Sequence, residues 1–230
     1  MIFGGDSRHL DISFRDENPP QTVTDILAAC GDSNAWDLPV SRRICRLLEI
    51  IQNTTAEPSV EAVTHCRYCG EQTSVELLIP DLKKLEPEGR DSIEVDSFRF
   101  RHPTGRDQAL WLGADFKSVE EATVPIAQTL CESPLPEDRQ LVERASVILQ
   151  ENDPLVAFRV DFVCPSCGEK QRAALDLQRL CLNILRSIQE GAFRAIHRLA
   201  AAYGWTEAEI LRLSPRRRER YLRLIDGASP

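Results

Sequence analysis

The sequence predicts an α+β fold, in which a zinc ribbon is split by a long α/β insertion and followed by a C-terminal three-helix module. Two Cys-x-x-Cys-Gly motifs, at residues 66–70 and 164–168, carry metal-ligand spacing. The 94 residues from 70 to 163 between the two cysteine pairs contain their own strand and helix patterns. After residue 177 the apolar residues recur at helical spacing. We therefore divide the chain into an N-terminal arm with helices (1–62), two ribbon halves (63–80 and 155–177), an inserted α+β segment (81–154) and a C-terminal helical module (178–230).

The composition is that of a globular protein that does not cross a membrane. Of the 230 residues, 42% are hydrophobic and 28% are charged, which is the usual balance for a globular chain. No apolar run reaches the roughly 20 residues that a transmembrane helix needs, and the acidic N-terminus lacks a secretory signal. We expect a cytoplasmic protein, or one associated with a particle, and no membrane partner.

The N-terminal segment predicts an arm and two helices. Residues 1–20 are polar and end in two prolines, which indicates a loosely held arm. Residues 22–30 form a short capped helical pattern that stops at Gly31. A second helix is predicted for residues 40–52, because its apolar residues recur at helical spacing. The polar run at 53–58 ends it.

The middle of the chain predicts strands around the cysteine motifs and helices between them. Alternating residues predict strands at 73–79, 93–101 and 155–163. A turn at 102–107 leads into a short helix through Leu110 and Leu112, and two longer helices are predicted at 118–131 and 136–150.

The last third predicts three helices with a small core of their own. A long helix runs over 177–202 and is expected to be interrupted at Gly191. Thr206 and Glu209 form a capping-box pattern for the second helix, and Ser214-Pro215 starts the third. The expected core residues are Leu199, Trp205, Ile210, Leu211, Leu213, Tyr221, Leu222 and Ile225.

The paired cysteines predict one structural Zn²⁺ per chain, held by Cys66, Cys69, Cys164 and Cys167. Two thiolates separated by two residues can reach one tetrahedral ion, and the following glycine supplies the backbone angles of the tight turn. Four thiolates leave no open coordination position, which is typical of structural zinc. Redox chemistry at a single Cys-x-x-Cys, or remnant thiols, are the alternatives. The remaining cysteines lie singly in apolar helical patterns and are expected to be buried small hydrophobes: Cys30, Cys45, Cys131 and Cys181.

Charge and motif content favour a binding protein over an enzyme. The sequence has no phosphate-binding glycine loop, no His-Glu-x-x-His and no nucleophile elbow, so we expect no enzymatic activity and no small-molecule substrate. The net charge of −8 disfavours a nucleic-acid partner. Residues 186–223, however, hold nine arginines against four glutamates. Because of this basic helical tail, the alternative function is that of a zinc-ribbon/helix-turn-helix regulator that binds nucleic acid.

Two stretches resemble a known family. The knuckle at Cys164, the Leu-Asp-Leu run at 175–177 and "IHRLAAAYGWTEAEILRLSPRRRERYL" are similar to the T4-type baseplate hub assembly proteins of contractile phage tails and extracellular contractile injection systems. The upstream "FRFRHPTGRDQALWL" also resembles that family, with His102 at a position where an apolar residue is expected. The resemblance covers about residues 60–226 and implies an assembly chaperone whose partners are baseplate or hub proteins. The residues expected to bind such partners are His197, Tyr203, Trp205, Arg216, Arg217, Arg218 and Arg220.

Overall fold

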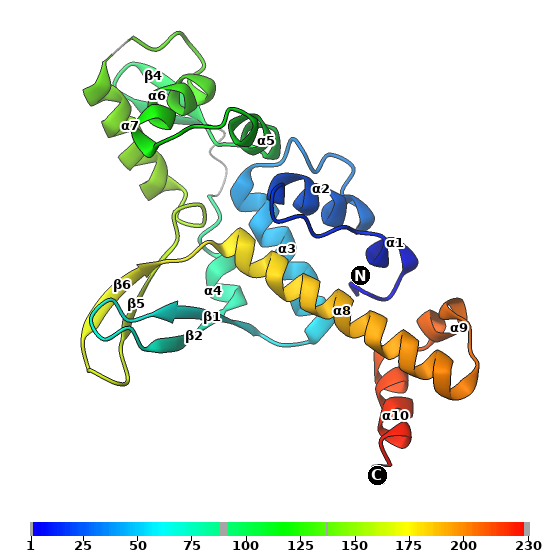
Figure 1. Cartoon of the computed structure of the whole chain (residues 1–230). Coiled ribbons are helices and arrows are strands. Elements are labelled where there is room, and N and C mark those ends of the chain that lie inside the picture. Colours follow the sequence, from blue (N-terminus) through cyan, green and yellow to red (C-terminus); the bar gives the residue numbers. More distant parts are fainter. Residues whose placement is uncertain (1, 88–91, 137, 228–230) are drawn as a thin grey trace.

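The computed structural model describes residues 2–87, 92–136 and 138–227 and has an α+β fold of helices and small antiparallel sheets (Figure 1). The helices are α1 (Ser7–Leu10), α2 (Pro19–Ala29), α3 (Val40–Thr55), α4 (Ile79–Lys83), α5 (Gly105–Gly113), α6 (Val119–Leu130), α7 (Arg139–Asn152), α8 (Leu177–Tyr203), α9 (Glu207–Arg212) and α10 (Pro215–Ile225). The strands are β1 (Ser59–His65), β2 (Gln72–Leu78), β3 (Ser92–Val95), β4 (Phe98–Arg101), β5 (Arg159–Val163) and β6 (Lys170–Ala174). Among these residues no helix is long and apolar enough to cross a membrane.

The strands form three separate hairpins in the part of the chain that the structure describes. β1 pairs with β2, β3 with β4, and β5 with β6, each antiparallel. The prediction of one continuous strand at 93–101 was wrong, because the segment forms two strands, β3 and β4. Asp96, with a positive φ of 54°, lies in the turn that joins them. The strand predicted at 155–163 begins only at Arg159, after a turn at residues 154–157. β1 and β6 had not been predicted.

The central hydrophobic cluster joins the N-terminal helices to the first half of α8. Most of its fully buried residues come from α2, α3 and α8; Ile79 of α4 and Leu155 are also fully buried, and β1 and β2 contribute further members. Figure 1 shows α8 crossing in front of α3, with the hairpins β1–β2 and β5–β6 towards one end of α8 and α9 and α10 at the other. The helix α3 continues to Thr55, three residues beyond its predicted end, and stops at Ala56 in a left-handed conformation.

The N-terminal arm is not loosely held, so the prediction for residues 1–20 was wrong over residues 2–12. Phe3 is buried, and its backbone N–H donates to Thr54 Oγ1 at 2.9 Å. The side-chain amide of Gln189, on α8, donates to the carbonyls of His9 at 2.8 Å and Ile12 at 2.9 Å. These bonds hold the arm against α8. If the arm detached, the buried Gln189 amide would lose its partners, at a cost of about 1–3 kcal/mol. Met1 lies outside the described residues.

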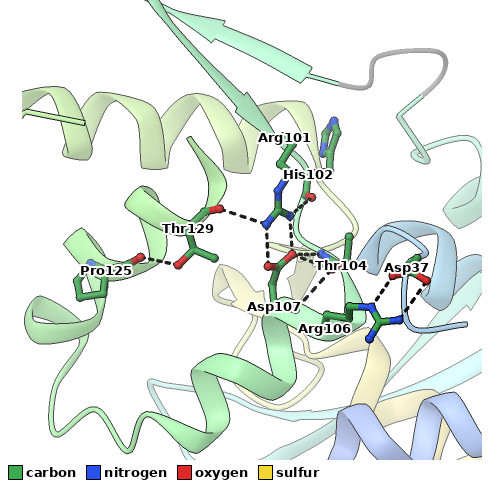
Figure 2. Close-up of polar contacts among 8 residues, drawn as sticks. All are labelled: Asp37, Arg101, His102, Thr104, Arg106, Asp107, Pro125 and Thr129. Carbon is green, nitrogen blue, oxygen red and sulfur yellow. Dashed lines mark hydrogen bonds and ion pairs between the residues drawn. The ribbon is translucent and has the colours of Figure 1, made fainter. Parts of the chain in front are cut away.

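The segment between the hairpins has its own core and is attached through the turn at residues 102–105. Its cluster is formed by Ile93, Val95, Phe100, Ala127, Leu130, Leu141, Val142 and Ala145. The N–H of Val40 donates to the Pro103 carbonyl at 2.8 Å, and Gly105 packs directly on the buried guanidinium of Arg43. Within the segment, Arg101 forms two hydrogen bonds with Asp107, at 2.6 and 2.8 Å, and Thr104 caps α5 (Figure 2). The helices predicted at 118–131 and 136–150 correspond to α6 and α7, although residue 137 lies outside the described residues.

The C-terminal helices form the third cluster. Leu199, Trp205, Ile210, Leu211, Tyr221 and Leu222 belong to it as predicted, whereas Ile225 is exposed. Gly191 does not interrupt α8, which is continuous to Tyr203, so this part of the prediction was wrong. The capping box of Thr206 and Glu209 is confirmed, and Pro215 takes the first turn of α10, but the Ser214 side chain makes no capping bond.

Candidate metal centre

The four predicted metal ligands lie at the tips of two hairpins that face each other. Cys66 and Cys69 occupy the turn that joins β1 to β2, and Cys164 and Cys167 occupy the turn that joins β5 to β6. The pairing of each hairpin runs up to the turn, with His65 opposite Gln72 in one and Val163 opposite Lys170 in the other. A stiff antiparallel stem therefore supports each cysteine pair.

The two turns have the same backbone geometry. In the first, the N–H of Gly70 donates to the Cys66 carbonyl at 2.8 Å, and the N–H of Cys66 donates to the Glu71 carbonyl at 2.8 Å. In the second, the corresponding bonds from Gly168 and Cys164 measure 2.9 and 3.0 Å. Gly70 and Gly168 have φ values of 76° and 75°, which a residue with a Cβ rarely adopts. This explains why a glycine follows each cysteine pair.

The sulfur atoms are spaced as the ligands of one tetrahedral ion. All four Sγ atoms lie within 4.8 Å of one another. Cys66 Sγ lies 3.6 Å from Cys167 Sγ, and Cys69 Sγ lies 3.7 Å from Cys164 Sγ. A tetrahedral ion with metal–sulfur bonds of about 2.3 Å requires sulfur–sulfur distances of about 3.8 Å. The four cysteines are therefore placed so that they could hold one metal ion.

Each hairpin contributes one buried and one exposed ligand. Cys66 and Cys164, the first cysteine of each pair, are buried, whereas Cys69 and Cys167 are exposed. His65 lies beside Cys66 in sequence but is exposed and does not belong to the group. The set consists of sulfur ligands alone, which is the ligand type that zinc and iron–sulfur centres use.

Gln171 joins the two hairpins next to the cysteines. Its amide nitrogen donates to Cys66 Sγ at 3.1 Å, and its amide oxygen accepts from the N–H of Arg67 at 3.0 Å. Such hydrogen bonds to a ligand atom orient it and favour its charged form. Gln171 was not among the predicted site residues. The signal in the sequence is its position: Gln171 follows Cys167 by four residues, just as the similarly buried Thr73 follows Cys69.

Hydrogen bonds divide the thiols into a more acidic and a less acidic pair. Burial raises the pKa of Cys66, but hydrogen bonds from the backbone at Cys69 and Tyr68 and from Gln171 outweigh it and bring the pKa to about 6. Backbone N–H groups, first that of Cys167, also lower the pKa of Cys164. At Cys167 the N–H of Glu169 lowers the pKa, but burial and the neighbouring thiols raise it to about 12. The two buried thiols are thus more acidic than an ordinary cysteine, and a bound cation would favour the thiolate at all four positions.

The remaining cysteines are only partly as expected. Cys45 and Cys181 are completely buried in the central cluster, and burial raises the pKa of both thiols. Cys30 and Cys131 are half-buried rather than buried.

The residues expected to bind a partner do not form one continuous group. Tyr203 and Trp205 stack with ring centroids 4.7 Å apart, and Tyr221 of α10 packs edge-on against both. His197 is exposed on α8, and within the described residues no hydrogen bond or ring contact joins it to these aromatics. Arg216, Arg217 and Arg220 are exposed on α10. Arg218 is only 8% exposed, and burial lowers its pKa, so it offers less surface than the other three arginines.

Comparisons of the chain with protein families, with curated proteins and with solved structures found no match in any of the three.

Proposed function

We propose that the four cysteines bind one structural Zn²⁺ as a split zinc ribbon, and that the chain is a non-enzymatic protein that assists assembly of the baseplate of a contractile tail-like particle. The sulfur–sulfur distances and the closed set of four thiols support zinc in a structural role. Zinc bound in this way contributes on the order of 10–16 kcal/mol, which is as large as the whole stability of a typical domain. The ion would fasten the hairpin β1–β2, which precedes the inserted segment, to the hairpin β5–β6, which follows it.

The observation that carries the partner-binding part of the proposal is the surface at the end of α8 and along α10. We name it the terminal surface and define it by Tyr203, Trp205, Arg216, Arg217 and Arg220. Aromatic and arginine side chains are the residues that contribute most to protein–protein interfaces. Figure 1 places α10 and the C-terminal end of α8 at the end of the molecule opposite the two cysteine hairpins. Because its exposed charges are positive, it suits an acidic face on a baseplate or hub protein.

The experiment is co-expression of the chain with the tail and baseplate proteins encoded beside it. We expect the chain to co-purify with a baseplate or hub protein, and particle yield to fall when the chain is omitted. A variant with Arg216→Glu, Arg217→Glu and Arg220→Glu should lose the co-purification while keeping its metal. Wild-type complex formation by that variant would contradict the role of the terminal surface.

A matched control places the same charge change elsewhere. Arg99, Arg139 and Arg144 are exposed on the inserted segment, so their combined change to Glu alters the net charge equally. This control variant should bind the partner as the wild type does. If both variants lose binding, the effect is one of net charge and the proposed surface is wrong.

The exposed arginines of α10 also favour the alternative, a zinc-ribbon/helix-turn-helix regulator. In that case the same residues would contact phosphates, and the affinity for duplex DNA would fall steeply with salt concentration. Measurement of DNA binding at two salt concentrations separates the two functions. We expect no salt-dependent binding, because the chain carries a net charge of −8.

A further inference from the structure

A second site lies in the inserted segment, away from the cysteines. A cavity of about 390 Å³ is enclosed by α5, α6, α7 and the turn that follows α7. Its walls are mostly apolar, with Ile126, Leu130 and Leu149 among them. The volume falls within the range of about 300–1,000 Å³ that is usual for small-molecule pockets.

Two buried polar side chains interrupt this apolar wall. His102 and Asp153 both line the cavity and are only 7% and 3% exposed. His102 Nδ1 lies 3.4 Å from Asp153 Oδ2, and Figure 2 shows the imidazole turned away from the neighbouring Arg101–Asp107 pair. Neither ring nitrogen of His102 and neither carboxyl oxygen of Asp153 has a hydrogen-bond partner among the described residues.

A third polar group at the cavity is also unpaired. Trp111 lines the cavity from α5, and its buried indole N–H has no acceptor in the described part of the chain. Buried polar groups are nearly always hydrogen-bonded, and each one left without a partner costs about 1–3 kcal/mol. Three such side chains around one apolar cavity therefore leave hydrogen-bond donors and acceptors available to a group inside it.

The rim of the cavity is apolar and open to solvent. Val119 and Val156 line it and are 79% and 45% exposed. An apolar rim around a cavity with a few polar groups is the usual form of a binding site for a small, largely apolar molecule.

We propose that this cavity binds a small uncharged molecule with an apolar body and one head group that both donates and accepts hydrogen bonds, such as an alcohol or a primary amide. The head group meets His102 and Asp153, which together supply a donor and an acceptor, and the body fills the space against α6 and α7. A cationic head would have to displace His102 from Asp153, and an anionic head would be buried beside the Asp153 carboxyl group, so both are disfavoured. A hydrocarbon would leave the polar pair unsatisfied. The lining of this cavity shares no residue with the terminal surface, so the site is separate from the proposed assembly function.

The test compares three probes of nearly equal shape: benzyl alcohol, toluene and benzylamine. The indole N–H signal of Trp111 reports binding in nitrogen-labelled protein, and Trp36 and Trp205 serve as internal references. Benzyl alcohol should shift the Trp111 signal in a saturable manner. Its dissociation constant should be at least about tenfold lower than those of toluene and benzylamine. Absence of a saturable shift, or equal affinity for benzyl alcohol and toluene, would overturn the proposal.

Two neighbouring residues of α7 give a matched pair of variants. Ser146 lines the cavity, so Ser146→Phe should fill it and abolish the Trp111 shift. Val147 is exposed and does not line it, so Val147→Phe should bind benzyl alcohol as the wild type does. Undiminished binding by Ser146→Phe would show that the probe sits elsewhere and would refute the site. In His102→Leu the preference for benzyl alcohol over toluene should disappear, and a preserved preference would refute the role of the polar pair.

Discussion

Gly105 offers the sharpest test of how the inserted segment is attached to the rest of the chain. A Cβ at this position would lie 1.9 Å from Arg43 Nη1 and 2.5 Å from Arg43 Cζ, far inside contact distance. Arg43 cannot retreat easily, because its guanidinium donates to the Ala35 carbonyl at 2.6 Å, the Pro20 carbonyl at 2.7 Å and Thr24 Oγ1 at 3.0 Å. Gly105→Ala must therefore break part of this network or separate α5 from α3.

The expected cost follows from the bonds that are lost. Hydrogen bonds to a charged group contribute about 1.5–3 kcal/mol each, so the loss of two gives a destabilisation of roughly 3–6 kcal/mol. Arg43 remains charged near neutral pH, since burial lowers its pKa only to about 10. The predicted loss is a large part of the roughly 5–15 kcal/mol that stabilises a typical domain. Urea unfolding followed by circular dichroism measures it.

The same helix contains a matched control. Gly113, the last residue of α5, has no atom within 4 Å of an added Cβ, so Gly113→Ala should be neutral or slightly stabilising. In an Arg43→Met background, Gly105→Ala should cost much less than in the wild type, because the colliding guanidinium is gone. Equal stability of the Gly105→Ala and Gly113→Ala variants would refute the packing argument.

Three further outcomes are expected. Burial raises the pKa of Asp107, but hydrogen bonds from Arg101 and Thr104 outweigh burial and lower the pKa below its ordinary value of 3.8. The Asp107 carboxylate therefore stabilises the fold above about pH 4, and this stabilisation is lost as the pH falls through the pKa of the folded state. Asp107→Asn should thus cost about 2 kcal/mol at pH 7, with a smaller difference from the wild type near pH 3 in the same urea assay; an equal difference at both pH values would contradict this. Gln189→Leu should release the N-terminal arm, seen as faster amide hydrogen exchange at residues 7–12, whereas unchanged exchange would show that the arm is held otherwise. Cys45 and Cys181 should stay unmodified by a thiol reagent until the protein unfolds, and mass spectrometry of labelled peptides would reveal early reaction at either residue.

The fold could be predicted from the sequence where local patterns determine it. The amphipathic helices α3, α6 and α7 and the glycine-ended turns follow from spacing within a few residues. The hairpin β3–β4 was missed because the alternation of residues 93–101 continues through its turn, and only the positive φ of Asp96 separates the strands. The arm was judged loose because its polar composition hides the contact between Gln189 and His9, which are 180 residues apart.

The candidate sites divide in the same way. The four cysteines were found because each pair lies within a four-residue turn whose chemistry is readable from sequence. Gln171 was missed because its two partners lie more than 100 residues away along the chain. His102 and Asp153 carry no motif; they follow β4 and α7 in the chain, and only the packing of α7 against the β3–β4 hairpin places them side by side.

The central claim is that one zinc ion holds the two hairpins together through Cys66, Cys69, Cys164 and Cys167. The most direct measurement is the zinc content of the purified chain by elemental analysis, combined with thermal unfolding before and after treatment with a chelator. The account predicts one zinc per chain, its loss in a Cys164→Ser variant, and a large fall in melting temperature once the metal is removed. A chain that is folded without zinc, and that unfolds at the same temperature with and without chelator, would contradict it.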